Sequence, residues 1–142
     1  MPKLIIFDSD GTLTPLRGSA TGPFSFELLP GVVEKCAELR AQGHVLAIAS
    51  NQSRRRSRGE VVQQLRWTQR TIGASTIRWA ASARCKPSPA MLLEIAQQFN
   101  VQPADVLFVG DWETDKQAAE SAGCGFAWST EFFKGEEKCR RK

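Results

Sequence analysis

The stretch KLIIFDSDGTL, residues 3–13, constrains the fold more than any other part of the chain. Its apolar run, residues 4–7, ends abruptly in the carboxylates of Asp8 and Asp10. Bounded apolar runs of this length are typical of buried parallel strands, and open parallel sheets bind ligands where such strands end. Two like charges this close favour a cation between them, because otherwise one carboxylate must protonate. The alternatives are therefore a site for a hard ion such as Mg²⁺ or a plain turn rich in Asp, Gly and Thr.

Length and composition indicate one ordinary globular unit. The chain has 142 residues, of which 42% are hydrophobic and 24% charged, enough for one domain with one core. We expect a single domain over residues 1–130 and a charged C-terminal tail over 131–142. No apolar run is long enough to span a bilayer and the first residues lack the layout of a secretory signal, so we expect a cytoplasmic protein, monomeric or a small homo-oligomer.

The cysteines do not predict a metal centre. None of the four forms a C-x-x-C pair. His44 is the single histidine, so no second histidine can join it as a metal ligand. A zinc site needs four ligands with tight spacing, so reduced thiols are the favoured interpretation. The cysteines are Cys36, Cys85, Cys124 and Cys139.

Positive charge is concentrated in one segment. Residues 54–86 contain nine basic side chains and one acidic side chain, a net charge of +8, whereas the rest of the chain carries −4. Such a segment either steers an anionic substrate, with nucleic acid as one possibility, or forms a solvated helix face. Its densest part is the basic tract Arg54, Arg55, Arg56 and Arg58.

Strand and helix patterns alternate along the chain. After the first strand, apolar or β-branched runs predict strands at 45–49, 76–80, 106–109 and 124–128. Amphipathic segments between them predict helices that begin near Pro30, Glu60 and Pro89, and a fourth that carries three inward alanines before Gly123. Alternation of this kind indicates an α/β fold with a parallel sheet covered by helices on both faces. The long irregular segment 13–29 is typical of a functional loop, often a lid, and Val33, Trp67 and Trp112 are expected to pack.

Polar residues follow three of the predicted strands, and a lysine precedes one of the predicted helices. In a parallel sheet these side chains meet along one edge. Carboxylates there can hold Mg²⁺, a hydroxyl and an amide can hold phosphate oxygens, and a lysine can neutralise charge, which together describe a phosphoryl-transfer site. The residues are Asp8, Asp10, Ser50, Asn51, Lys86, Asp111 and Asp115.

The motifs that carry these residues occur in the order of a known family. DSDGTL, ASNQ, CKPSP and GDWETD resemble the four motifs of the haloacid dehalogenase superfamily of aspartate-nucleophile phosphatases. The residues of the ASNQ and CKPSP motifs are most similar to those of its histidinol-phosphatase and heptose-bisphosphate-phosphatase branch. The resemblance implies a three-layer, Rossmann-like fold with a minimal cap or none. The sequence lacks the zinc loop common in that branch and has Ser53–Arg56 where a Gly-rich turn is usual.

The resemblance also implies a role for each residue. Asp8 would attack phosphorus to form an aspartyl-phosphate, and Asp10 would protonate the leaving oxygen and then activate water. Asp8, Asp111 and the backbone carbonyl of Asp10 would bind Mg²⁺. The remaining roles are phosphate binding by Ser50, Asn51 and Lys86, and support of the metal or orientation of Lys86 by Asp115.

Three functions remain open at this stage. The first is a Mg²⁺-dependent phosphomonoesterase that acts on a small phosphorylated metabolite, such as a sugar or amino-alcohol phosphate. The second is a 3′-phosphatase that acts on nucleotide or polynucleotide ends, suggested by the basic tract. The third is a non-catalytic phosphoacceptor domain, which has no need of a second acid such as Asp10 for fast dephosphorylation.

Overall fold

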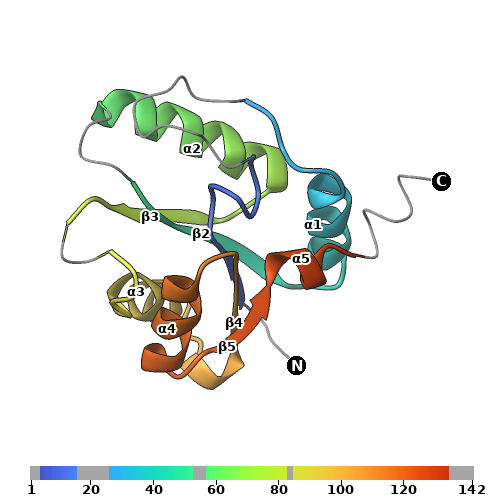
Figure 1. Ribbon diagram of the computed structural model, residues 1–142. Coiled ribbons are helices and arrows are strands. Elements are labelled where there is room, and N and C mark those ends of the chain that lie inside the picture. The colour runs from blue at the N-terminus through green and yellow to red at the C-terminus, as the bar shows by residue number, and fades with distance from the viewer. Residues whose placement is uncertain (1–3, 16–25, 53–56, 83–84, 135–142) are drawn as a thin grey trace.

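The computed structural model describes residues 4–15, 26–52, 57–82 and 85–134 (Figure 1). It contains the parallel sheet that the sequence predicts, with five strands in the order β3-β2-β1-β4-β5. Every neighbouring pair runs parallel. The strands are β1 (Leu4–Phe7), β2 (Val45–Asn51), β3 (Thr76–Ala80), β4 (Val106–Gly110) and β5 (Gly125–Trp128).

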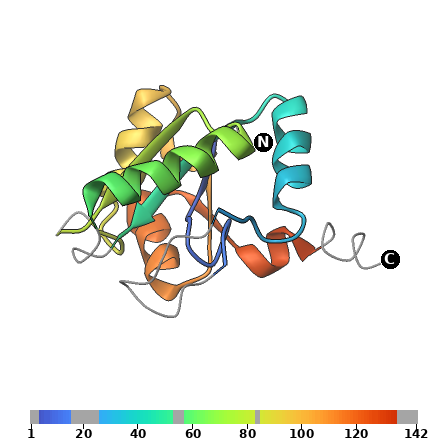
Figure 2. The same ribbon diagram turned by 90° about the horizontal axis from the view of Figure 1, so that it is seen from above.

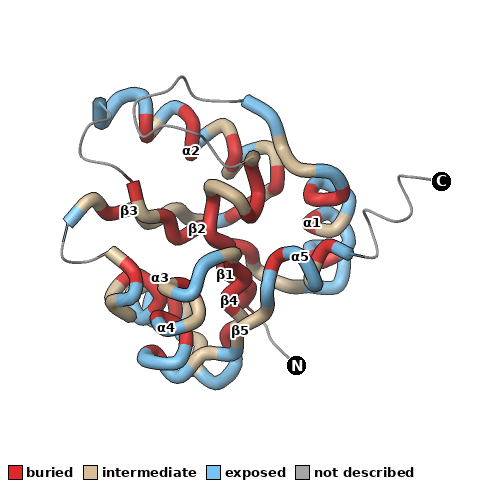
Figure 3. The backbone as a smooth tube through the Cα atoms, viewed as in Figure 1, coloured by how far each residue is buried: buried red, intermediate tan, exposed pale blue. Residues whose placement is uncertain are grey.

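Helices cover both faces of this sheet, as expected (Figures 1 and 2). On one face, Ile5 and Phe7 of β1 pack with α1 and α2. On the other face, Leu4 and Ile6 pack with α3 and α4. Because successive strand residues point to opposite faces, the four-residue run of β1 contributes to both cores and is wholly buried (Figure 3). The helical segments are α1 (Val32–Ala41), α2 (Arg58–Ile72), α3 (Ala90–Gln98), the short η1 (Pro103–Asp105), α4 (Glu113–Ala122) and α5 (Ser129–Phe132).

Local signals explain where the helices begin and which faces they bury. Helix α2 begins at Arg58, two residues before the predicted start, because the Ser57 hydroxyl accepts the backbone N–H of Glu60 and donates to its carboxylate. The Ser57 side chain is therefore the N-cap of α2. The prediction for Val33 was wrong: it is 43% exposed. It follows Val32 directly, and one residue along a helix is a turn of about 100°, away from the face that Val32 and Cys36 bury.

The loop between β1 and α1 is fastened at its base. The backbone N–H of Leu29 donates to the carbonyl of Leu13 over 2.8 Å, so the two ends of the segment predicted as a lid lie side by side. Three residues before Leu29, the ring of Phe26 meets the ring of Trp67 edge-on, with centroids 5.7 Å apart. Trp67 therefore has part of the packing that was expected of it. Residues 16–25 of this segment lie outside the described residues.

Packing at the C-terminal end continues beyond residue 130, where the domain was expected to end. Phe133 is 6% exposed and stacks on Phe7, with ring centroids 5.9 Å apart. Phe132 meets the same ring edge-on. The segment 131–134 therefore contributes to the core beside α1 and α2, whereas the rest of the predicted tail, 135–142, lies outside the described residues.

We expect Phe133→Ala to lower the free energy of unfolding by about 3 kcal/mol, the usual cost of removing a buried phenylalanine ring. Urea unfolding followed by circular dichroism measures this change. Phe26→Ala is the matched control, because Phe26 is 52% exposed. Equal and small effects of the two substitutions would contradict the assignment of Phe133 to the core.

The strand order places a crevice beside β1. From β1 the chain builds β2 and β3 on one side and then returns to build β4 and β5 on the other. Open α/β sheets bind ligands at such a reversal, outside the carboxyl ends of the strands. The ends of β1 and β4 are therefore the expected location of the site.

Candidate active site

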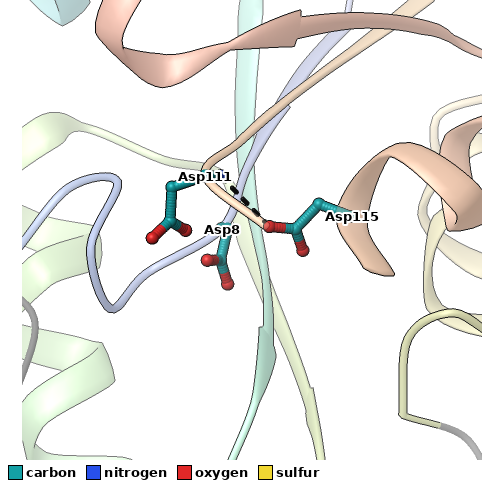
Figure 4. Close-up of side chains that lie close together, drawn as sticks. All are labelled: Asp8, Asp111 and Asp115. Atoms are coloured by element: carbon teal, nitrogen blue, oxygen red, sulfur yellow. Dashed lines mark hydrogen bonds between the residues drawn. The ribbon is translucent and has the colours of Figure 1, made fainter. Parts of the chain in front are cut away.

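Asp8 and Asp111 converge at the reversal between β1 and β4. The backbone N–H of Asp8 donates to the carbonyl of Val109 over 3.0 Å, so the ladder between the two strands continues past Phe7 and aligns their ends. Asp111 follows β4 directly, and Asp115 lies one helical turn later in α4. The three carboxylates each place an oxygen within 4.8 Å of the others, and they point toward one another in Figure 4.

The turn after β1 fastens this arrangement. The carbonyl of Ser9 accepts the backbone N–H groups of Thr12 and Leu13, and Gly11 occupies the left-handed region at φ 82°, which favours glycine. The turn presents the Thr12 hydroxyl to Asp111 Oδ1 over 3.1 Å. Thr12 thus connects the first and last motifs, a role that the sequence analysis missed although the residue belongs to the quoted motif DSDGTL.

Asp115 is held at the start of α4 by backbone groups. Its Oδ2 accepts the N–H of Asp111 over 3.2 Å and the N–H of Trp112 over 3.1 Å. The carboxylate lies directly over Gly110, where an added Cβ would come within 2.5 Å of it. Glycine at this position therefore allows the close approach, and the other oxygen, Oδ1, contacts Lys86.

Lys86 reaches the centre of the site from the turn before α3. Its Nζ lies 2.8 Å from Asp8 Oδ1, 2.8 Å from Asp115 Oδ1 and 2.9 Å from the carbonyl of Ala49. The ammonium thus has three oxygen partners, as many as it has protons to donate. Burial alone would lower the pKa of Lys86, but the two carboxylates outweigh burial and the pKa is raised. Lys86 is therefore a fixed positive charge.

Among the residues that the structure describes, the acidic side chains of the site outnumber the one cation that contacts them. Burial raises the pKa of Asp8 to about 8, helped by Asp115 and opposed by Lys86. Burial likewise raises the pKa of Asp111, although hydrogen bonds with Asp8 and Thr12 oppose the shift. Three carboxylates beside one ammonium leave unbalanced negative charge, which a divalent cation would neutralise. Oxygen-only ligands suit a hard ion such as Mg²⁺, so the residues fit the predicted cofactor.

Asn51 and Ser50 lie where β2 ends, but their side chains are already engaged. Asn51 Oδ1 accepts the N–H of Lys86 over 2.8 Å, and its Nδ2 donates to the carbonyl of Lys86 over 3.1 Å. Asn51 therefore holds the backbone of Lys86, and one amide hydrogen is left to donate. The Ser50 hydroxyl is buried, accepts from Gln52 Nε2 over 2.8 Å and lies 3.3 Å from the carbonyl of Asn51.

A cavity of about 210 Å³ opens above these groups. The half-buried Asp10 lies on its wall, with the Thr14 hydroxyl 3.4 Å from Asp10 Oδ1. Trp112, expected to pack, is instead 57% exposed on the same wall, so that prediction was wrong. The lining residues are Asp8, Asp10, Asn51, Lys86, Trp112, Thr114 and Asp115.

The structure describes only part of the basic tract. Arg54, Arg55 and Arg56 of the basic tract lie outside the described residues, whereas Arg58 begins α2 with its guanidinium 5.5 Å from the centre of the Trp79 ring. Among the described segments, no helix is both long enough and apolar enough to cross a membrane.

Comparison with known proteins agrees with this geometry. The haloacid dehalogenase-like hydrolase family model matches residues 22–123. A D-glycero-beta-D-manno-heptose-1,7-bisphosphate 7-phosphatase of Yersinia pestis is 28% identical over 85% of this chain and 76% of its own length. A phosphoglycolate phosphatase of Pseudomonas putida is 37% identical over 66% of this chain, but over only 34% of its own length.

A solved structure agrees as well. The heptose 1,7-bisphosphate phosphatase of B. bronchiseptica, crystallised with magnesium and phosphate, superposes with a TM-score of 0.77 and 27% identity. The alignment covers 87% of this chain and 78% of that one. With the family model over most of the chain, these matches show that the protein belongs to the haloacid dehalogenase-like hydrolases and is a phosphatase.

Proposed function

We propose that the protein is a Mg²⁺-dependent phosphomonoesterase that works through an aspartyl-phosphate on Asp8. The single observation that carries this proposal is the position of Asp8: it is a buried residue of the cavity lining, and one of its oxygens accepts from Lys86 over 2.8 Å. That contact fixes the orientation of the carboxylate, and the second oxygen is assigned to the attack on phosphorus.

The reaction requires two proton transfers, both assigned to Asp10. As an Asp8 oxygen bonds to phosphorus, the bond to the leaving oxygen breaks, and Asp10 donates a proton to that oxygen. Asp10 then takes a proton from a water molecule that attacks phosphorus, which releases inorganic phosphate and restores the Asp8 carboxylate. The half-buried position of Asp10 on the cavity wall gives it access to both the leaving group and water.

The other side chains bind and orient. Asp8, Asp111 and the carbonyl of Asp10 would hold Mg²⁺, which when bound supplies positive charge to the phosphoryl oxygens. Lys86 supplies a second, permanent charge, and Asp115 orients Lys86 because both of its carboxylate oxygens are already bonded. The free hydrogen of Asn51 Nδ2, and the Ser50 hydroxyl after rotation, are assigned to phosphate oxygens.

The proposed substrate is a small phosphorylated metabolite such as a sugar phosphate. The relatives named above act, by their names, on a heptose bisphosphate and on phosphoglycolate, and a 210 Å³ cavity is smaller than the roughly 300–1,000 Å³ of common ligand pockets. A panel of phosphate esters, assayed for phosphate release with Mg²⁺ and with EDTA, tests the proposal. The panel includes sugar bisphosphates, phosphoglycolate and a 3′-phosphorylated oligonucleotide.

We expect Mg²⁺-dependent turnover of at least one small ester. Release from the oligonucleotide alone would favour the 3′-phosphatase, and no release from any ester would overturn the proposed function. A lasting phosphorylated protein without turnover would instead indicate the phosphoacceptor domain.

Mg²⁺ binding should depend on pH through Asp8. Because the pKa of Asp8 is raised to about 8, the ion must displace a proton from this carboxylate at lower pH. The apparent affinity for Mg²⁺ should therefore rise by up to about tenfold per pH unit below pH 8 and level off above it. Calorimetric titration with MgCl₂ between pH 6 and 9 measures this, and a flat profile would contradict the raised pKa.

A further inference from the structure

Trp112 is held rigidly by its backbone while its side chain stands in solvent. Its N–H donates to Asp115 Oδ2 over 3.1 Å, and its carbonyl accepts the N–H groups of Asp115 and Lys116 at the first turn of α4. The residue is nevertheless 57% exposed, the largest exposure among the large hydrophobic side chains described. A large aromatic side chain on the wall of a cavity is in position to contact a ligand that binds there.

The other three tryptophans of the chain have partners. The ring of Trp67 meets Phe26, the ring of Trp128 meets Phe126 with centroids 4.9 Å apart, and Arg58 lies over Trp79. Within the described residues, the ring of Trp112 has neither an aromatic nor a cationic partner. Its indole is therefore available to a molecule that enters the cavity.

The size of the cavity decides which part of a substrate Trp112 would meet. Asp8 and Lys86 are buried residues of the cavity lining, and the phosphoryl group must lie beside them for Asp8 to attack it. With about 210 Å³ in total, little volume remains for the rest of the ester. The leaving group must extend toward the exposed part of the lining, and Trp112 is the lining residue that is exposed.

We propose that Trp112 is a specificity-determining residue that stacks on the leaving group, which therefore carries a ring with a flat apolar face. An aromatic ring and the C–H face of a sugar ring share this property, and both stack on indole. The inference rests on the proposed function, because it places the phosphoryl group on Asp8. It adds the class of leaving group, which the acidic cluster by itself does not select.

The test compares Trp112→Ala and Trp112→Phe on three esters: p-nitrophenyl phosphate, α-glucose 1-phosphate and glycerol 3-phosphate. Loss of a stacking partner costs about tenfold or more in binding. We expect Trp112→Ala to raise KM about tenfold for one or both ring esters with kcat little changed, and to leave the acyclic ester within twofold. Trp112→Phe should restore most of the loss. The ring ester that is affected identifies the leaving group as aromatic or as a sugar.

Trp128→Ala is the control for removal of an exposed tryptophan near the same sheet edge, since Trp128 pairs with Gly110 across β4 and β5. It should not discriminate between ring and acyclic esters. Equal losses on all three esters for Trp112→Ala, or no loss on any of them, would overturn the inference.

A binding measurement separates this inference from the proposed chemistry. Phenylphosphonate and methylphosphonate cannot be hydrolysed as esters, so calorimetric titration with Mg²⁺ present reports binding alone. We expect Trp112→Ala to weaken phenylphosphonate about tenfold and methylphosphonate by less than twofold. If that selectivity is found while no ester is hydrolysed, the inference stands and the proposed function falls. If both phosphonates weaken equally while esters are hydrolysed, the reverse holds.

Discussion

Asp8→Asn should reduce phosphate release by at least about 10³-fold, because an amide oxygen is a poor nucleophile and loss of a nucleophile usually removes most of catalysis. The substitution keeps the shape of the side chain, so the Lys86 contact can be made to the amide oxygen. The initial rate of phosphate release with saturating Mg²⁺ and the best ester of the panel measures the effect. A variant that retains a tenth of the wild-type rate would exclude Asp8 as the nucleophile.

The stability of this variant distinguishes lost chemistry from lost folding. In the metal-free protein the pKa of Asp8 is about 8, above its unfolded value near 4. Asp8 therefore favours folding at low pH, and that contribution is lost as the pH rises from about 4 to about 8. Because a neutral side chain is the preferred form at pH 7, asparagine should unfold at nearly the same urea concentration as wild type. Asp105→Asn, the same change at an exposed acid, should alter neither activity nor stability.

Lys86→Met should lower the free energy of unfolding by about 3–5 kcal/mol without Mg²⁺, as is usual when one partner of a buried ion pair is removed. The Nζ is 2.8 Å from both Asp8 and Asp115, so methionine would leave these carboxylates without a cation. Activity should also fall sharply, since the positive charge beside the phosphoryl group is lost. Urea unfolding at pH 8 measures the change in stability.

The response to Mg²⁺ makes this prediction specific. The ion supplies positive charge to the same carboxylates, so it should recover more stability in Lys86→Met than in wild type. Lys116→Met, on α4 and only partly buried, is the control and should cost little with or without the ion. An equal response of all three proteins to Mg²⁺ would show that the ion does not bind beside Asp8 and Asp115.

The fold was predictable because its signals are local. The apolar runs around Ile5, Ile48 and Phe108 are bounded by turn residues and form the central strands. Strand–helix alternation then restricts the chain to a parallel sheet with helices on both faces. The observed start of a helix differed from the predicted start where a polar residue caps it. Ser57 caps α2, which therefore begins earlier than the apolar residues indicate.

The convergence of Asp8, Asp111 and Asp115 was also predictable, but the contacts that hold these side chains in place were not. Spacing after strands brings Asp8 and Asp111 to one edge in any parallel sheet. No spacing rule states that Asn51 bonds to the backbone of Lys86, or that Asp115 bonds to Lys86 and to two backbone N–H groups. These contacts join residues from different motifs, and their geometry depends on how the turns pack.

By itself, the order of residues determined the sheet and the edge at which the carboxylates gather, because hydrophobic periodicity and strand ends are properties of neighbours in the chain. Only the tertiary structure decided that Phe133 is buried, that Val33 is not, and that Trp112 is an exposed residue of the cavity wall. The exposure of an apolar side chain depends on what the rest of the chain places over it, and that is set by packing between segments far apart in sequence.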